Sequence, residues 1–147
     1  MPQSAQGGIT VLRPRSDNSL EVIDEIHLPY AIDNLSEDKD GTLWAAVLPK
    51  GIEIMKQAND PHHYFPSSSA FKLSRGKNGK FITEKVLEDS DGSVLPGTTT
   101  VVHDARTGRL FLSGVYTYET ASECANMAKK VSSPLSSPFA MLQNEHF

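Results

Sequence analysis

The sequence predicts an all-β fold, and three observations support this prediction. Hydrophobic residues alternate with polar residues in short runs, which is the period of a half-buried β-strand. Gly, Pro and Asp interrupt these runs at short intervals, as expected for strands joined by tight turns. A weak internal repeat indicates that one hairpin pattern is used twice. The chain has 147 residues, 38% hydrophobic and 22% charged, which is a composition typical of one globular domain.

The first half of the chain predicts four strands. In order, they cover residues 8–12, 20–28, 31–35 and 42–48. The second of these alternates almost strictly, and Leu20, Val22 and Ile26 share the face that we expect to be buried. The fourth, Thr42–Leu48, is almost continuously apolar, so we expect burial on both faces. Between the last two strands, Asp38-Lys39-Asp40-Gly41 predicts a tight turn.

The second half predicts two hairpins and a tail. The hairpins pair residues 70–73 with 80–87, and residues 98–103 with 109–116. Residues 51–57 fit either a strand or a helical turn, and residues 59–69 predict a loop. One further helical stretch is expected around 119–130. We place a domain of β-blades at 1–128 and a Ser/Pro-rich, disordered tail at 129–147, because the tail has few apolar residues to offset its ordering entropy.

The internal repeat sets the expected architecture. Asp38-x-x-Gly41-x-Leu43-Trp44 and Asp104-x-x-x-Gly108-x-Leu110-Phe111 both read as strand, Asp-to-Gly turn and strand. Repeated units of about 40–50 residues suggest the four-stranded blades of a β-propeller. The chain has room for about two to three blades, whereas closed propellers have roughly four to eight. The repeat therefore predicts a partial β-propeller, and a complete small β-sandwich is the alternative.

Composition and charge exclude several classes of function. The net charge is -4 and the pI is near 5.7, which argues against a nucleic-acid-binding protein. No apolar stretch approaches the length of a membrane span, and the N-terminus has no signal-peptide pattern. Cys124 is the single cysteine, so it either stays a free thiol or pairs with a segment outside this chain.

Asp33 and Asn34 are the most distinctive polar pair. They interrupt an otherwise apolar strand, where an unpaired carboxylate is unfavourable. Asp and Asn oxygens are typical Ca²⁺ ligands, so the pair fits a calcium site. A turn in which both side chains bond the backbone is the alternative.

The remaining candidates favour structural roles. We expect His62 and His63 to be solvated in a loop, His27 to lie on a strand surface, and His103 to bond to the adjacent turn at Asp104. Asp38 and Asp40 resemble the start of an EF-hand loop, but Pro49 stands at the twelfth position, so a hairpin is predicted instead. No P-loop, dinucleotide fingerprint or nucleophile elbow is present.

Five groups of motifs connect the chain to a known family. In order, they are Gly7-Gly8-Ile9-x-Val11, the stretch from Leu20 to Ser36, Gly41-x-Leu43-Trp44 with Pro49-x-Gly51, the stretch from Glu88 to Thr99, and Gly108-x-Leu110-Phe111-Leu112-x-Gly114, ending near Glu123-Cys124. In these motifs the chain resembles the paraoxonase/arylesterase family of six-bladed β-propeller lactonases, which is related to the gluconolactonase and strictosidine synthase-like propellers. The loop at 56–69 and the tail lie outside the resemblance.

The resemblance implies the C-terminal part of a calcium-dependent propeller hydrolase. Asp33 and Asn34 match the family's pair that ligates the catalytic calcium in the central tunnel. Cys124 matches a cysteine that the family bonds to an N-terminal one, which has no counterpart in this chain. The family's other ligands, a Glu and two Asn, and its proposed His dyad also have no counterpart, so no catalytic residue is assigned. Leu48 stands where some relatives have a His, which alters the active-site wall.

We therefore expect a fragment of a calcium-dependent hydrolase that acts on small aryl esters or lactones and is inactive by itself. Two alternatives remain: a non-enzymatic module whose exposed β-edges bind a partner or complete another chain's propeller, and a degenerate product without function. The family's disulfide and calcium fit a secreted or extracellular location.

Overall fold

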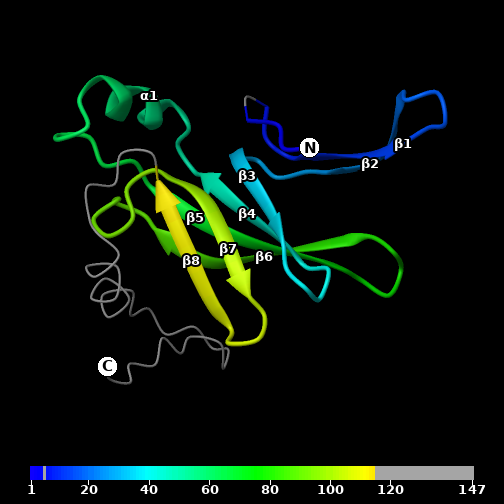
Figure 1. Cartoon of the computed structure of the whole chain (residues 1–147). Coiled ribbons are helices and arrows are strands. Elements are labelled where there is room, and N and C mark those ends of the chain that lie inside the picture. Colours follow the sequence, from blue (N-terminus) through cyan, green and yellow to red (C-terminus); the bar gives the residue numbers. More distant parts are fainter. Residues whose placement is uncertain (5, 115–147) are drawn as a thin grey trace.

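A computed structural model describes residues 1–4 and 6–114 of the chain. It contains eight strands and one helix (Figure 1): β1 (Ile9–Pro14), β2 (Leu20–Ile26), β3 (Ala31–Glu37), β4 (Leu43–Leu48), α1 (Ile52–Asn59), β5 (Ser68–Arg75), β6 (Phe81–Asp89), β7 (Thr98–Asp104) and β8 (Arg109–Gly114). The all-β prediction is thus confirmed. Cys124, the helical stretch expected at 119–130 and the tail at 129–147 lie outside the described residues.

The strands form three antiparallel sheets, and none of them closes on itself in the described part of the chain. The central sheet has the order β3-β4-β5-β6, and the hairpins β1-β2 and β7-β8 form one two-stranded sheet each. The expected turns at Asp38–Gly41 and Asp104–Gly108 join β3 to β4 and β7 to β8. Both predicted hairpins of the second half are confirmed.

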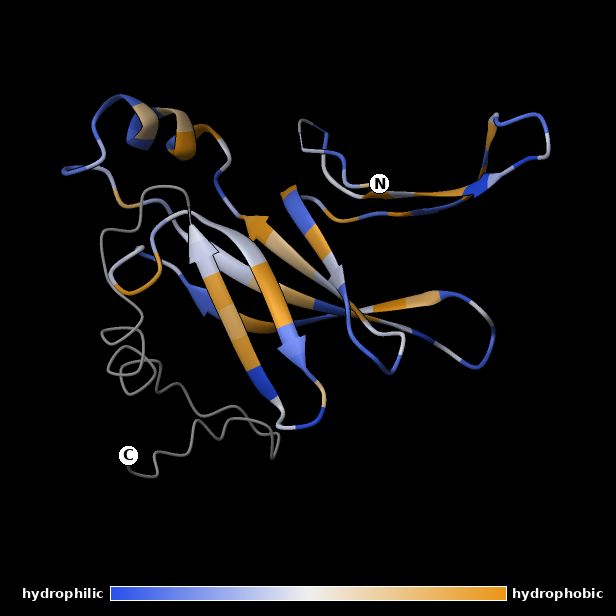
Figure 2. Cartoon of the chain, viewed as in Figure 1, coloured by the Kyte–Doolittle hydropathy of each residue, from blue (hydrophilic) through white to orange (hydrophobic). Residues whose placement is uncertain are grey.

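The central sheet is covered on both faces, because each face carries its own apolar cluster. The β1-β2 hairpin packs on one face with Ile9, Ile26, Leu28, Ile32, Ala45, Val47, Phe71 and Leu73. The β7-β8 hairpin packs on the other face with Trp44, Ala46, Ala70 and Val101. β4 contributes to both clusters, and its residues from Trp44 to Leu48 are buried, as its apolar sequence predicts. Figure 2 shows this strand as mostly hydrophobic, whereas β7 and β8 are hydrophobic only in their middle parts.

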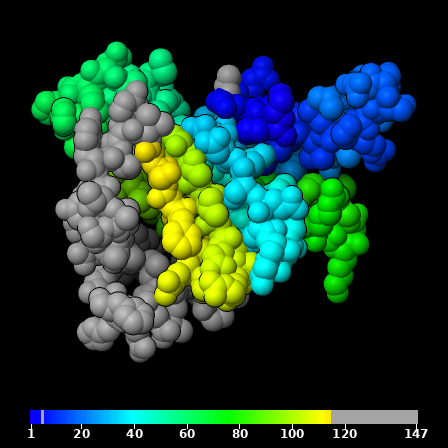
Figure 3. Space-filling view, in the orientation of Figure 1, coloured from blue at the N-terminus to red at the C-terminus, as the bar shows by residue number. Residues whose placement is uncertain are grey.

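The predicted burial of β2 is wrong for its first half. Leu20 is 61% exposed and Val22 is 57% exposed, whereas Ile26 is buried. A β-bulge at Ile23 interrupts the alternation between Val22 and Ile26, because Leu12 pairs with Val22 while Val11 pairs with Asp24. The turn end of the β1-β2 hairpin extends beyond the central sheet (Figure 3). The alternation therefore identified the strand, but neither its bulge nor how far the neighbouring sheet reaches.

The ambiguous segment at 51–57 is helical. α1 follows β4 directly, with Gly51 at its N-terminus and no capping side chain. Within the described residues, no helix is long and apolar enough to cross a membrane. α1 and the loop at residues 90–97 lie at the same end of the central sheet as the start of β3 (Figure 1), and this end holds the candidate site.

Candidate functional site

Asp33 and Asn34 lie at an irregular point of β3. Ile32 pairs with Val47 while Leu35 pairs with Ala45, so the two polar residues share a single position opposite β4. This is a β-bulge, a feature that redirects side chains and is frequent beside active sites. A regular strand would direct neighbouring side chains to opposite faces, and the bulge removes that strict alternation. The alternative prediction of a turn at this pair is wrong, because both residues belong to β3.

The carboxamide of Asn34 connects β3 to β7. Its Nδ2 donates to the backbone oxygen of Thr99 at 2.9 Å and to Oγ1 of Thr100 at 3.3 Å. Both bonds use the amide nitrogen, so Oδ1 keeps its capacity to accept a hydrogen bond or ligate a cation. The nitrogen thus positions the side chain and leaves the oxygen available.

Asp33 carries a half-buried carboxylate. Partial burial raises the pKa of Asp33 above its ordinary value, because the loss of water disfavours the charged form. Within the described residues, no hydrogen bond or nearby cation opposes this effect. Groups with a shifted pKa are more frequent at functional sites than elsewhere, so Asp33 is a candidate for a functional role.

Replacing Asp33 with asparagine is expected to stabilise the chain slightly at pH 7, by a few tenths of a kcal/mol, because it removes a partly desolvated charge whose effect solvent screening keeps small. The folded pKa is raised, so the ionised carboxylate destabilises the fold above that pKa, and this penalty is lost as the pH falls from there to below the ordinary value of 3.8. The advantage of Asp33→Asn should therefore vanish in acid. Urea unfolding at pH 7 and pH 3 measures it. A variant less stable than wild type at pH 7 would show that Asp33 has a stabilising partner.

The Asp33–Asn34 pair supplies oxygen atoms of the kind that calcium binds, but too few of them for a complete site. Carboxylate and carboxamide oxygens are the hard ligands that Ca²⁺ takes, and calcium requires six to eight of them. Across residues 1–4 and 6–114, no group of three or more His, Cys, Asp or Glu side chains is arranged to hold a metal ion. A complete site would need several further oxygen ligands.

The other predicted residues have structural surroundings. His63 is exposed, and its Nδ1 lies 2.8 Å from Oδ1 of Asp60. His27 is exposed directly after β2. Asp38 and Asp40 belong to the β3-β4 turn, so the hairpin prediction is confirmed over the EF-hand. Leu48 is buried at the end of β4.

A second polar cluster joins Asp38, Trp44 and His103. Trp44 donates from Nε1 to Oδ2 of Asp38 at 2.9 Å, and Nδ1 of His103 lies 2.7 Å from the same oxygen. The Trp44 and His103 rings stack with their centroids 4.4 Å apart. We expected His103 to bond to its own turn at Asp104. This prediction is wrong, because His103 bonds to Asp38 in the β3-β4 turn. Sequence reasoning found both Asp turns but not the packing that brings His103 to the first.

Asp38 is the most strongly stabilised carboxylate of the described residues. Its side chain is only 3% exposed, and its Oδ1 accepts bonds from the backbone nitrogens of Asp40 and Thr42 at 3.0 Å each. Burial alone would raise the pKa of Asp38, but the bonds from Trp44, His103, Thr42 and Asp40 outweigh it and hold the pKa at about 2. The ionised carboxylate can only accept, so Nδ1 of His103 carries the proton.

The cluster is one end of a regular contact between the central sheet and β7. Every second residue from the bulge to the turn bonds to every second residue of β7. In chain order these contacts are Asn34 with Thr99, Ser36 with Val101, and Asp38 with His103. The Asp38 cluster therefore fixes the register of β7, and this register sets the position of Asn34 at the other end.

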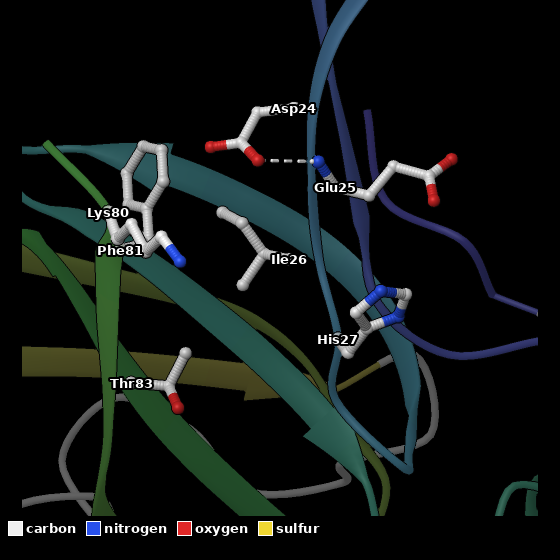
Figure 4. A pocket seen from close by; sticks show the side chains of 7 residues that line it. All are labelled: Asp24, Glu25, Ile26, His27, Lys80, Phe81 and Thr83. Atoms are coloured by element: carbon white, nitrogen blue, oxygen red, sulfur yellow. Dashed lines mark hydrogen bonds between the residues drawn. The ribbon is translucent and has the colours of Figure 1, made fainter.

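A groove between β2 and β6 does not include the Asp33–Asn34 pair. It has a volume of about 270 Å³ and is lined by Asp24, Glu25, Ile26, His27, Lys80, Phe81 and Thr83. Figure 4 shows Asp24 and Ile26 facing Lys80 and Phe81, while Glu25 and His27 lie on the other side of the β2 backbone. Asp24 bonds only to the backbone nitrogen of Glu25. The groove thus shows no nucleophile activated by a base.

Comparison with known families and with curated proteins yields no match to this chain.

Proposed function

We propose that this chain is part of a calcium-dependent hydrolase of aryl esters or lactones, built on a β-propeller, to which Asp33 and Asn34 contribute two metal ligands. The observation that carries the proposal is the bulge in β3. It holds a desolvated carboxylate without a partner among the described residues beside a carboxamide whose oxygen is available. Two adjacent oxygen ligands of this kind suit a hard cation.

The sheet arrangement supports the propeller part of the proposal. The central sheet has four antiparallel strands in sequential order, β3-β4-β5-β6, and a complete propeller blade has the same arrangement. The hairpins packed on its two faces correspond to halves of the preceding and following blades. In such an arrangement β3 is the innermost strand, so Asp33 and Asn34 would face the central tunnel.

The chemistry expected at such a site is metal-assisted hydrolysis. A bound calcium ion supplies Lewis acidity that stabilises negative charge on a carbonyl oxygen. Asp33 binds through its carboxylate, while Asn34 is held by Thr99 so that its oxygen keeps a fixed direction. The raised pKa of Asp33 is lowered again by a bound cation, so metal binding and loss of the proton are coupled.

Calcium titration by calorimetry tests the assignment. We expect the 147-residue chain to bind calcium with a dissociation constant of about 1 mM or weaker, because most ligands of a complete site are missing. Asp33→Ala should abolish this binding. Asp40→Ala, which removes an exposed carboxylate from the β3-β4 turn, is the matched control and should leave it unchanged. Binding that is unaffected by Asp33→Ala would refute the ligand assignment.

The same preparation tests the expectation that the chain is inactive by itself. No calcium-dependent hydrolysis of phenyl acetate or of a simple lactone is expected. Measurable calcium-dependent turnover would show that the site is more complete than two ligands.

An interaction module is the second candidate, because the two hairpins leave strand edges without partners among the described residues. β1-β2 and β7-β8 are two-stranded sheets, and Val102 and Phe111 are exposed on the second of them. Exposed edges of this kind accept a further strand from a partner. Concentration-dependent assembly in sedimentation experiments, with no Asp33-dependent calcium binding, would favour the module over the hydrolase.

A further inference from the structure

Gln57 of α1 is a buried polar side chain that the calcium proposal does not use. It is 1% exposed, and neither Nε2 nor Oε1 has a hydrogen-bond partner within the described residues. A buried carboxamide can donate two bonds and accept two, and buried polar groups in folded proteins are nearly always paired. Where such a conflict between sequence and packing persists, a functional role is a common reason.

The helix that carries Gln57 exposes hydrophobic side chains and buries a polar one. α1 exposes Ile52 (74%) and Met55 (63%) while it buries a glutamine. Its N-terminus lacks a capping side chain, and it packs only lightly on the strands. A short helix held in this way can move at little energetic expense, since few buried apolar contacts oppose the motion.

The carboxamide of Gln57 lies against the start of the segment 97–99. The same segment accepts the hydrogen bond from Asn34. A Cβ at Gly97 would lie 2.5 Å from Oε1 of Gln57, so this glycine permits the close approach of α1. Two residues further along, the backbone oxygen of Thr99 accepts the bond from Asn34. Two residues of extended chain span about 7 Å. Gln57 and the Asp33–Asn34 pair thus lie at the two ends of one short segment.

We propose that Gln57 is a binding residue for a small hydroxy carboxylic acid, reached when α1 moves away from Gly97. Nε2 donates to a carboxylate oxygen of the ligand, and Oε1 accepts from its hydroxyl group. This deepens the proposed function, because a hydroxy acid is the product that lactone hydrolysis releases. The ligand then extends from Gln57 along residues 97–99 towards Asp33 and Asn34. The helix α1 is the movable wall of this site.

The test uses sodium 3-hydroxybutyrate as the probe, with butyrate as the analogue that lacks the hydroxyl group. Binding to the full chain is measured by NMR titration in EDTA, so that calcium plays no part. We expect 3-hydroxybutyrate to bind about tenfold more tightly than butyrate, as one hydrogen bond between ligand and site allows. Gln57→Met keeps the size of the side chain and should remove this preference. Lys56→Met, at the neighbouring exposed position of α1, should keep it.

A second measurement separates a binding role from a structural one. The free Gln57→Met variant should unfold at a higher temperature than wild type, because it removes an unpaired buried carboxamide. A lower temperature, or equal affinity of the wild-type chain for both probes, overturns the proposal even if the variant folds poorly. Hydroxyl-dependent binding that survives in EDTA while Asp33-dependent calcium binding fails would refute the calcium assignment alone. The opposite pattern would refute the role of Gln57 alone.

Discussion

Replacing Asp38 with alanine is expected to lower the free energy of unfolding by about 3 kcal/mol. The carboxylate accepts bonds from Trp44, His103 and two backbone nitrogens of its own turn, and the substitution leaves all four donors without it. Trp44 and His103 come from two different sheets, so the loss also weakens the packing of β7 on the central sheet. Urea denaturation followed by tryptophan fluorescence measures the change, since Trp44 is the single tryptophan.

Asp104→Ala is the matched control for this prediction. Asp104 holds the same place in the turn of β7-β8, where it accepts bonds from the backbone nitrogen of Arg106 and from Oγ1 of Thr107. Its bonds stay within one exposed turn and reach no other sheet, so its loss should be far smaller. Similar losses for the two variants would mean that the turn, and not the link between sheets, stabilises the fold.

The contribution of Asp38 depends on pH with a defined sign. Its folded pKa of about 2 lies below the ordinary value of 3.8, so its ionised form is favoured by folding. This stabilisation is complete above the ordinary value and is lost as the pH falls from there towards the folded value. The difference in stability between wild type and Asp38→Ala should therefore be constant near neutral pH and narrow between about pH 4 and pH 2. A difference that stays constant through this range would show that folding does not lower the pKa of Asp38.

The sequence predicted the strands well because their signals are local. Period-two alternation and the Asp-to-Gly turns depend on residues close in the chain, and β4 was correctly expected to be buried on both faces. The exposure of Leu20 and Val22 could not be predicted in this way. It depends on where the neighbouring sheet ends, which is a tertiary property.

The surroundings of the candidate residues depend on contacts that the sequence does not reveal. Residue types alone singled out Asp33 and Asn34, but the bulge that groups them depends on the register against β4. The partnership of Asp38 with His103 was missed, because the two residues are far apart in the sequence and meet only when β7 packs on the central sheet. The repeat of the two Asp turns was the available signal, since repeated hairpins tend to stack with equivalent turns side by side. Gln57 gave no signal, because a glutamine in a short helix is ordinarily exposed.

The loop that places Gly97 against Gln57 depends on a close backbone contact at Gly92. A Cβ at Gly92 would lie 2.2 Å from the backbone oxygen of Phe65, and the residue has a φ of +67°. Gly92→Ala is therefore expected to lower the free energy of unfolding by about 3 kcal/mol, because it adds a clash with backbone to the strain of the left-handed conformation. Gly108→Ala separates the two effects, since Gly108 has a φ of +70° with no atom within 4 Å of the added Cβ. It should lose only about 1 kcal/mol. Equal losses in urea denaturation would mean that the loop of residues 90–97 shifts to admit the methyl group, and it would then no longer hold Gly97 firmly against α1.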